Sequence, residues 1–300
     1  MVVKKIIGKI QSKIKKNNQI IQDGQKITKC LLEQESTYGL NTTERSQKII
    51  VSLTSFPARF EQLHLVIRSM LVQTMRPDEI LLYLDDTVGL EDLPKSLLDM
   101  KNYGLQIEIR AGNLKPHKKY YYAIKEHPNS IIVTIDDDLM YPPNTLEELY
   151  STYQRFPNCV VAARAHKMLF HSDGSAKKYN DWEWAYAKEY IPSMQLLATG
   201  CGGVLYPPNC MYDDLLNMEL LQRLSLQNDD LWLKIMQLLK GTKVVLCSQE
   251  IRKNRALVPG SQEESLNSSN VHQNDNDIYL KNLLEHYHLT ADDFSDEVAV

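Results

Sequence analysis

Three consecutive carboxylates, Asp136, Asp137 and Asp138, follow an apolar and β-branched run at residues 131–135. Such a run is typical of a strand buried on both faces of a parallel sheet, and ligands of these sheets bind beyond the carboxyl ends of the strands. On an extended backbone, Asp136 and Asp138 point to one side and Asp137 to the other. Two carboxylates on one side repel each other unless a cation lies between them. The triplet therefore predicts a divalent-metal site that holds substrate phosphates, with a solvated acidic turn as the alternative.

A second acidic pair, Asp229 and Asp230, comes directly after Asn228, at the start of a segment with helical periodicity. Asn and Asp are favoured N-caps, so Asn228 or Asp229 is expected to begin a helix that runs to about residue 240. The N-terminus of a helix stabilises a carboxylate as its anion. A positioned carboxylate can take a proton from a reacting hydroxyl, which makes this pair a candidate general base; simple capping is the alternative.

The elements that must position these acids alternate between strands and helices. We predict strands at 48–54, 79–84, 105–110, 131–135, 159–165 and 243–247, and helices at 59–73, 90–103, 117–126, 144–155 and 228–240, with Asn144 as the cap of the fourth helix. Alternation at such short intervals predicts an α/β fold with a mostly parallel sheet and right-handed crossovers. The pattern fades between residues 166 and 198, and long irregular segments of compact domains tend to carry function.

Composition points to a soluble globular chain. The 300 residues are 43% hydrophobic, and charge is uneven along them: residues 1–30 hold eight Lys and one acid, whereas residues 261–300 hold nine acids and one Lys. The acidic body argues against nucleic acid as a partner. Five scattered Cys predict reduced thiols rather than disulfides or a zinc site, and no apolar run is long enough for a signal peptide or a membrane span. We therefore predict a cytoplasmic protein.

The first residues have the pattern of a basic amphipathic helix. Val3, Ile7, Ile10, Ile14 and Ile21 fall in one stripe of a helical wheel, and lysines occupy the remaining surface. Such a helix can lie on an anionic membrane, which would place the protein peripherally on the inner face of the cell membrane. A helix that packs on the domain or on a partner is the alternative.

With the buried strand, the Asp-Asp-Asp turn and the later Asn-Asp-Asp-Leu-Trp-Leu segment in place, residues 48–250 resemble bacterial glycosyltransferases of the GT-A fold. The family 2-like enzymes of surface or capsular polysaccharide biosynthesis are the most similar. The resemblance implies a Rossmann-like, mostly parallel sheet flanked by helices, a nucleotide-sugar donor that we expect to be UDP-linked, and a saccharide or lipid-linked acceptor. The chain lacks the Gln-x-x-Arg-Trp helix of processive polymerases, which favours the transfer of single sugars.

The same resemblance assigns roles to the acids. It implies that Asp136 and Asp138 bind Mn²⁺ or Mg²⁺ on the donor diphosphate. It also implies that Asp230 is the base of an inverting transfer, with Asp229 capping the helix or binding the acceptor. His272 is a candidate third metal ligand, as a C-terminal residue is in some GT-A enzymes; a solvated side chain is the alternative.

The resemblance also implies that the loop after the first strand and the acid that ends the second strand hold the nucleoside, at Thr54, Ser55, Pro57, Arg59 and Asp85. Other residues expected to contact the nucleotide sugar are Lys118, Lys119, Asp136 and Asp137. A carboxylate at Asp85 can accept a hydrogen bond from a pyrimidine N–H or a ribose hydroxyl, with turn chemistry as the alternative. Lys118 and Lys119 can neutralise diphosphate as point charges, or else are solvated helix lysines.

Four residues are expected on the acceptor side. Trp182 and Trp184 offer aromatic faces on which a sugar can stack, although aromatic residues more often belong to a core. Gly202 and Gly203 either let the backbone approach a substrate or form a tight turn into a strand.

The expected division of the chain is a basic helical extension and linker at 1–47, a GT-A domain at 48–260, and an acidic C-terminal segment with one helix at 261–300. Within the domain, residues 48–143 form the nucleotide-binding half and residues 144–260 the acceptor half.

Two other functions fit the sequence. A sugar nucleotidyltransferase shares the sheet and the need for a metal, but it normally carries a glycine-rich phosphate loop after its first strand, and residues 54–57 contain no glycine. A non-catalytic carbohydrate-binding or membrane-associated scaffold could keep the same fold without turnover, since a fold does not fix function.

Overall fold

A seven-stranded sheet runs through the protein in the order β10-β6-β9-β4-β1-β2-β3. Its strands are β1 (Ile49–Thr54), β2 (Glu79–Asp85), β3 (Leu105–Arg110), β4 (Ile131–Thr134), β6 (Cys159–Ala162), β9 (Val204–Tyr206) and β10 (Lys243–Leu246). Strand β9 is antiparallel to both of its neighbours, and all other neighbouring pairs are parallel. The predicted α/β fold with a mostly parallel sheet is therefore confirmed.

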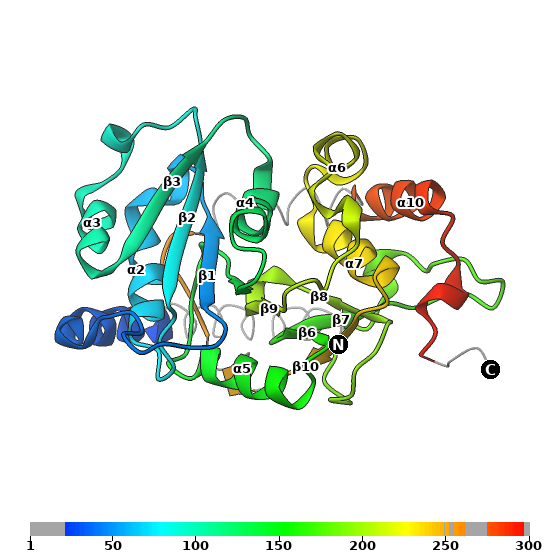
Figure 1. The fold of residues 1–300 in the computed structure, drawn as a ribbon, viewed down its shortest axis with the longest axis horizontal. Coiled ribbons are helices and arrows are strands. Elements are labelled where there is room, and N and C mark those ends of the chain that lie inside the picture. The colour runs from blue at the N-terminus through cyan, green and yellow to red at the C-terminus, as the bar shows by residue number, and fades with distance from the viewer. Residues whose placement is uncertain (1–21, 249, 252–254, 262–274, 297–300) are drawn as a thin grey trace, which may run out of the picture.

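The computed structural model describes residues 22–248, 250–251, 255–261 and 275–296 (Figure 1). The amphipathic pattern at residues 3–21 and the candidate ligand His272 lie outside the described residues. Within the described residues, no helix is long and apolar enough to cross a lipid bilayer.

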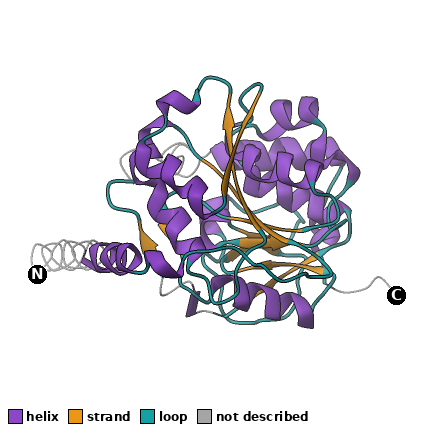
Figure 2. Ribbon diagram, turned by 60° about the vertical axis from the view of Figure 1, so that its left-hand side comes forward, coloured by secondary structure: helices purple, strands orange, loops and turns teal. Residues whose placement is uncertain are grey.

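Helices cover both faces of the sheet (Figure 2). Three of them pack on one face: α2 (Phe60–Leu71), α3 (Lys95–Leu98) and α5 (Thr145–Arg155). The opposite face carries α4 (Lys118–Glu126), α6 (Met218–Ser225), α7 (Asp229–Leu239) and α10 (Asp275–Tyr287). Two small antiparallel pairs flank the main sheet, β5 (Leu139–Met140) with β11 (Ala256–Leu257) and β7 (Ala165–Lys167) with β8 (Leu196–Ala198).

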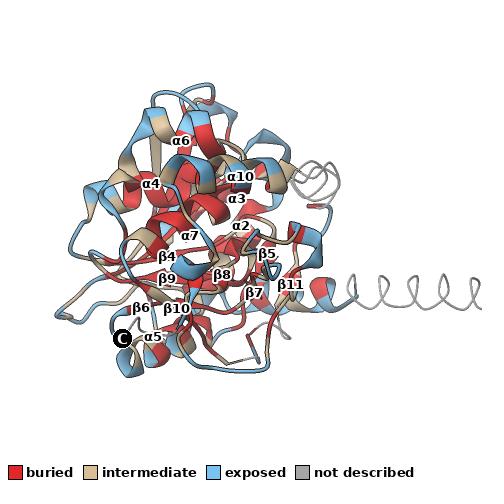
Figure 3. Ribbon diagram, turned by 90° about the vertical axis from the view of Figure 1, so that its right-hand side faces the viewer, coloured by how far each residue is buried: buried red, intermediate tan, exposed pale blue. Residues whose placement is uncertain are grey.

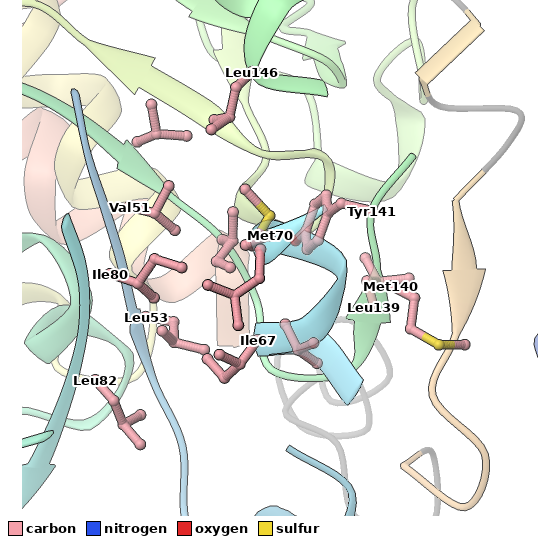
Figure 4. Close-up of a cluster of buried hydrophobic side chains, with 14 of the residues drawn as sticks. Val51, Leu53, Ile67, Met70, Ile80, Leu82, Leu139, Met140, Tyr141 and Leu146 are labelled. Carbon is pink, nitrogen blue, oxygen red and sulfur yellow. The ribbon is translucent and has the colours of Figure 1, made fainter. Parts of the chain in front are cut away.

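Side chains of the central strands alternate between two hydrophobic cores. In β1, Ile49, Val51 and Leu53 belong to the core beneath α2, whereas Ile50 belongs to the core beneath α4 and α7. Figure 4 shows the first of these cores, where Val51 and Leu53 face Ile67 of α2. Buried residues follow the sheet and the inner sides of the helices (Figure 3). A strand buried on both faces is a continuous apolar run, which is why these strands could be recognised in the sequence.

The parallel strands bring polar residues to one edge of the sheet. Strand β1 ends at Thr54, β2 ends at Asp85, and β4 is followed by the acid triplet that begins at Asp136. Because β1 pairs in parallel with both β2 and β4, these three ends lie at the same edge. This is the edge at which open α/β sheets bind their ligands.

Three of the predicted elements differ from the structure. The expected strand at 159–165 is divided, because β6 ends at Ala162 and Ala165 begins β7 in another sheet. The expected helix at 90–103 is reduced to α3 between two 3₁₀ turns, because Pro94 lacks a backbone N–H and holds Leu93 in an extended conformation. Asn144 occupies the N-cap position of α5, but its side chain makes no capping hydrogen bond, so its predicted capping role is wrong.

Both ends of the described chain pack on the sheet domain. Residues 22–33 are helical, and Leu31 is buried in the core beneath α2. At the other end, Leu280 and Leu283 of α10 are buried in the core beneath α7. Figure 1 shows α10 beside α6 and α7. The boundaries expected after residues 47 and 260 therefore do not coincide with a break in either core.

Candidate active site

One ammonium group lies between the two groups of acids that the sequence singled out. Lys119, in the first turn of α4, has its Nζ 2.7 Å from Asp136 Oδ1 and 2.9 Å from Asp229 Oδ2. Burial opposes protonation of this amine, but Asp136 and Asp229 outweigh it and raise the pKa of Lys119 well above its ordinary value. The end of β4 and the start of α7 therefore meet at a permanently charged lysine.

Helix α7 begins as the sequence predicts. Asn228 is its N-cap, and Asn228 Oδ1 accepts a hydrogen bond of 2.8 Å from the backbone N–H of Leu231. The cap fixes the first turn, which carries Asp229 and Asp230. The hydrogen bond of the cap therefore positions both acids.

Gly200 lies at the centre of this arrangement. Its backbone N–H donates a hydrogen bond of 3.0 Å to Asp230 Oδ1. A Cβ atom at Gly200 would lie 2.8 Å from Lys119 Nζ and 3.1 Å from Asp136 Oδ1, which is closer than packed atoms approach. A larger residue at this position would therefore displace the ammonium of Lys119 and the carboxylate of Asp136.

The two neighbouring acids of α7 have opposite electrostatic environments. Burial raises the pKa of Asp230 to about 7, and the negative charge of Asp229 adds to this effect. Burial also opposes ionisation of Asp229, but Lys119 outweighs it and keeps the pKa of Asp229 below its ordinary value. A carboxylate with a pKa near neutrality suits a general base, whereas Asp229 stays ionised as the partner of Lys119.

Arg59 organises the other two acids of the triplet. Asp137 is buried, accepts a hydrogen bond of 2.6 Å from Ser55 Oγ, and forms an ion pair with Arg59. Arg59 Nη2 also lies 3.5 Å from Asp138 Oδ2. Burial raises the pKa of Asp137 even though Arg59 opposes the shift. Ser55 and Arg59 thus contact carboxylates of the triplet, and their expected contact with a nucleotide stays a prediction.

The expected orientation of the triplet is wrong. Strand β4 ends at Thr134, so the alternation of an extended backbone does not reach the three acids. Asp137 and Asp138 share Arg59, while Asp136 turns to Lys119. Asp136 and Asp138 are therefore not two equivalent neighbours on one side of a strand.

Asp85 lies at the end of β2, but its carboxylate is already engaged. It forms an ion pair with the buried Lys118 and accepts a hydrogen bond from the Thr87 hydroxyl. Burial opposes its ionisation, and the hydrogen bonds from Lys118 and Thr87 outweigh that and lower the pKa of Asp85. Lys118 and Lys119 are both buried and paired with acids, so the alternative of solvated helix lysines is wrong, and their contact with a diphosphate stays a prediction.

The remaining two residues of the expected nucleotide site shape the β1 edge. Thr54 Oγ1 donates a hydrogen bond of 2.7 Å to the carbonyl of Tyr83 in β2. Pro57 begins the 3₁₀ turn Pro57–Arg59 that leads into α2. Both residues therefore hold the backbone around Ser55 and Arg59, and their contact with a nucleotide stays a prediction.

A buried histidine that the sequence did not single out joins the two sides of the site. His117 Nε2 lies 2.8 Å from the carbonyl oxygen of Ser225, and His117 Nδ1 lies 2.8 Å from the hydroxyl of Tyr120. A carbonyl can only accept, so Nε2 carries the proton and Nδ1 accepts from the Tyr120 hydroxyl. Ser225 Oγ in turn donates to the carbonyl of Asn228, the cap of α7. Contacts across such a separation leave no local pattern in the sequence.

The expected acceptor residues lie in different environments. Trp182 is buried in the core beneath α7, and its indole N–H donates to the carbonyl of Lys177. Trp184 is 41% exposed and lies 4.7 Å from the ring of His166, centroid to centroid. Only Trp184 of the two thus offers an open aromatic face, and Trp182 as a stacking platform is not compatible with its burial.

The two expected glycines serve the turn into β9. A Cβ atom at Gly202 would lie 2.9 Å from the backbone nitrogen of Arg164, and Gly203 has a φ of 88°. Close packing at the first and left-handed backbone at the second both require glycine. Contact of Gly202 and Gly203 with an acceptor stays a prediction.

The donor chemistry of the triplet fits a hard divalent ion that is completed by substrate oxygens. Asp136 is partly exposed, and only its Oδ1 atom is engaged by Lys119. Asp138 is also partly exposed, beside Arg59. Within the described residues, no three His, Cys, Asp or Glu side chains gather closely enough to hold a metal by themselves. Mg²⁺ and Mn²⁺ are commonly bound by one or two carboxylates with water and phosphate oxygens in the remaining positions.

The sheet and its acid-bearing edge define a Rossmann-like α/β fold of the GT-A type. The sequence profile of the family described as glycosyl transferase family 2 matches residues 55–204, which is half of the chain. The chain belongs to this family.

Solved structures with a similar arrangement include S. aureus TarS. Its residues 1–349 in complex with UDP align with a TM-score of 0.46 at 13% identity, covering 68% of this chain and 59% of that one. A longer TarS structure aligns with a TM-score of 0.46 at 15% identity, covering 68% and 36%. A UDP-glucose pyrophosphorylase complexed with UDP-glucose aligns with a TM-score of 0.39 at 12% identity, covering 81% and 98%. No curated protein matches the chain in sequence.

Proposed function

We propose that the protein transfers a single sugar from a nucleotide-diphosphate sugar, a UDP-sugar, to a hydroxyl of a saccharide or lipid-linked acceptor. The transfer inverts the anomeric carbon, depends on a divalent metal and serves the synthesis of a surface polysaccharide. Membership of glycosyl transferase family 2 supports the sugar transfer. The pairing of one ionised acid with one acid of near-neutral pKa at the start of α7 supports a base-assisted step.

In this mechanism Asp230 takes the proton of the acceptor hydroxyl while the hydroxyl oxygen attacks the anomeric carbon. The bond from that carbon to the diphosphate oxygen breaks, and its electron pair leaves with the nucleotide. The N–H of Gly200 holds Oδ1 of Asp230, so Oδ2 remains for the proton. Asp136 and Asp138 would hold a divalent metal, which stabilises the negative charge of the leaving diphosphate when it is bound.

Lys119 gives this arrangement its charge balance. It offsets Asp136 and Asp229 together, so that three acids can lie around Gly200 without mutual repulsion separating them. The single observation that carries the proposal is the position of Asp230. Asp230 has a pKa of about 7, its carboxylate is held by the N–H of Gly200, and it lies close to Asp136, which follows β4.

A direct test combines binding and turnover. The purified protein is incubated with UDP-glucose, UDP-galactose and UDP-N-acetylglucosamine, with and without Mn²⁺, and both the melting temperature and the release of UDP are measured. We expect one UDP-sugar to raise the melting temperature in the presence of Mn²⁺, because a ligand that binds only the folded state stabilises it. Because no acceptor is present, we also expect slow hydrolysis of the same donor by water, which releases UDP.

The controls separate the alternatives. Asp230→Asn should bind the same donor but lose most of the turnover, whereas Asp213→Asn, an exposed acid in the same half, should behave like the wild type. Stabilisation without any release of UDP would favour a non-catalytic scaffold. If no nucleotide stabilises the protein in either condition, the donor assignment fails.

A further inference from the structure

Two arginines converge on the loop that contains Gly200. Arg164, between β6 and β7, has its Nη1 atom 3.0 Å from Thr199 Oγ1 and 3.5 Å from Cys201 Sγ. Arg255, directly before β11, has its Nη1 atom 2.7 Å from the carbonyl oxygen of Cys201 and 3.5 Å from the same sulfur. Two guanidinium groups from distant parts of the chain therefore meet at one residue.

Among the described residues, no carboxylate lies close enough to either arginine to form an ion pair, although both arginines are only partly exposed. By contrast, Arg59 and Lys119, on the side of the acid triplet, are each paired with two acids. Like charges that share one contact repel each other, and an anion between them removes that repulsion.

The shape of the groups selects the kind of anion. A guanidinium presents a planar fork of N–H donors that matches the two oxygens of a carboxylate or of a phosphate. The neutral contacts that Arg164 and Arg255 make with Thr199 and Cys201 fix the side chains without consuming their charge. The pair is therefore preorganised for an anionic group.

The surroundings of Arg164 place this anion on the side of Asp230. The backbone N–H of Gly200 donates to Asp230 Oδ1, and Arg164 and Arg255 contact Thr199 and Cys201, the residues on either side of Gly200. Tyr179 packs against Trp184, with ring centroids 5.6 Å apart, and against His166, with ring centroids 5.7 Å apart. The exposed face of Trp184 offers a surface on which a sugar ring can stack. The two arginines and the candidate base thus all contact the loop at residues 199–201.

We propose that Arg164 and Arg255 bind a carboxylate or phosphate carried by the acceptor, so that the enzyme selects an anionic saccharide rather than a neutral one. This rests on the proposed function, because it takes Asp230 as the group that faces the acceptor. The other source of such an anion is the diphosphate of the donor, and the experiment separates the two.

The experiment measures binding of three probes to the protein with and without UDP. D-Glucuronate carries a carboxylate, D-glucose 6-phosphate carries a phosphate, and D-glucose is the uncharged control. We expect the two anionic sugars to bind the UDP-saturated protein at least about tenfold more tightly than D-glucose, as charge-assisted hydrogen bonds do. Arg164→Gln and Arg255→Gln should remove this preference while UDP binds within about twofold of the wild type. Arg155→Gln, an exposed arginine at the end of α5, should change neither.

Each result decides the matter. Equal binding of the three sugars, or a preference that survives both substitutions, overturns the proposal. A loss of UDP affinity of about tenfold or more in Arg164→Gln also overturns it, since the arginines would then serve the donor. UDP could also fail to bind both the wild type and Arg164→Gln. If the wild type alone still prefers the anionic sugars over D-glucose, the anion site stands and the donor assignment of the proposed function fails.

Discussion

At the scale of single residues, Asp229 and Asp230 show how neighbours in sequence acquire different chemistry. Both lie in the first turn of the same helix, yet only Asp229 reaches Lys119. Asp230 instead accepts one backbone N–H from Gly200 and faces two other negative charges. A neutral N–H stabilises an anion less than an ammonium does, so Asp230 holds its proton more tightly.

The rate of transfer should therefore depend on the ionisation of Asp230. The pKa of about 7 means that Asp230 is protonated below neutrality and cannot accept the proton of the acceptor hydroxyl. We expect kcat to rise with pH through about 7 and to level off above it. A pH series of initial rates at saturating donor checks this. A profile that is flat between pH 5.5 and 8.5 would contradict the role of Asp230 as base.

Asp230 should also lower the stability of the fold. Its folded pKa is raised above the unfolded value, so the folded state binds the proton more tightly, and stability is present at low pH and lost as pH rises from about 4 to 7. Asp230→Asn has no carboxylate to ionise, so it should not lose this stability as pH rises. Because the side chain keeps a partly exposed edge that water screens, we expect a gain of about 1–2 kcal/mol at pH 8 and none at pH 4.

Chemical denaturation of Asp230→Asn and wild type at both pH values measures this gain. Asp213→Asn, an exposed acid, serves as the control and should change stability by less than about 0.5 kcal/mol at either pH. A loss of stability in Asp230→Asn at pH 8 would show that the surroundings of Asp230 do not destabilise its ionised carboxylate.

At the scale of elements, the sequence predicts what is local and misses what is tertiary. The apolar runs of β1, β2 and β4 and the cap of α7 were predicted, since each depends on a few adjacent residues. The antiparallel direction of β9 was not, because it is set by pairing with β4 and β6. The acid triplet was recognised by type, but its orientation depends on Arg59 and Lys119, which come from other elements.

Substitution of His117 tests how much its hydrogen bonds contribute to holding α4 against the start of α7. Burial lowers its pKa to about 4, so it is neutral at neutral pH and acts through its two hydrogen bonds. His117→Phe leaves the carbonyl of Ser225 and the hydroxyl of Tyr120 without these partners. We expect a loss of about 2–4 kcal/mol of unfolding free energy, and a larger fall in kcat than in donor affinity because Lys119 and Asp229 shift relative to each other.

His117→Gln separates positioning from simple filling of space. A glutamine amide can still donate to the Ser225 carbonyl, so this variant should recover at least half of the lost stability and turnover. His127→Phe, at the other end of α4, is the matched control. Equal losses in His117→Phe and His117→Gln would show that the hydrogen bonds do not matter.

At the scale of the whole molecule, the two hydrophobic cores extend beyond the domain that sequence patterns outlined. The polar stretch after residue 260 indicates a separate C-terminal segment. Burial of α10, however, depends on its tertiary contacts with α7, and a local sequence pattern does not predict such contacts. Phe294, after α10, is fully buried and packs on the ring of Phe170 with centroids 5.1 Å apart. Asp296 accepts a hydrogen bond of 2.7 Å from the backbone N–H of Met194, just before β8. Residues 294–296 thus pack on the segment that contains Phe170 and Met194.

Phe294→Ala should therefore destabilise the fold without removing any contact of the candidate site. The cavity left by a buried Phe costs about 3–5 kcal/mol. Its ring also covers the ammonium of Lys234 on α7, 5.6 Å from the ring centroid, so α7 loses a contact one turn beyond Asp230.

Urea denaturation measures the loss of stability in Phe294→Ala. The control Ile278→Ala, exposed on α10, should change stability by less than about 0.5 kcal/mol. Because Arg59 and Asp85 lie far along the sheet at the β1 and β2 ends, UDP affinity at low temperature should stay within about twofold. A stability equal to that of the wild type would mean that the C-terminal segment rests on the domain without contributing to its core.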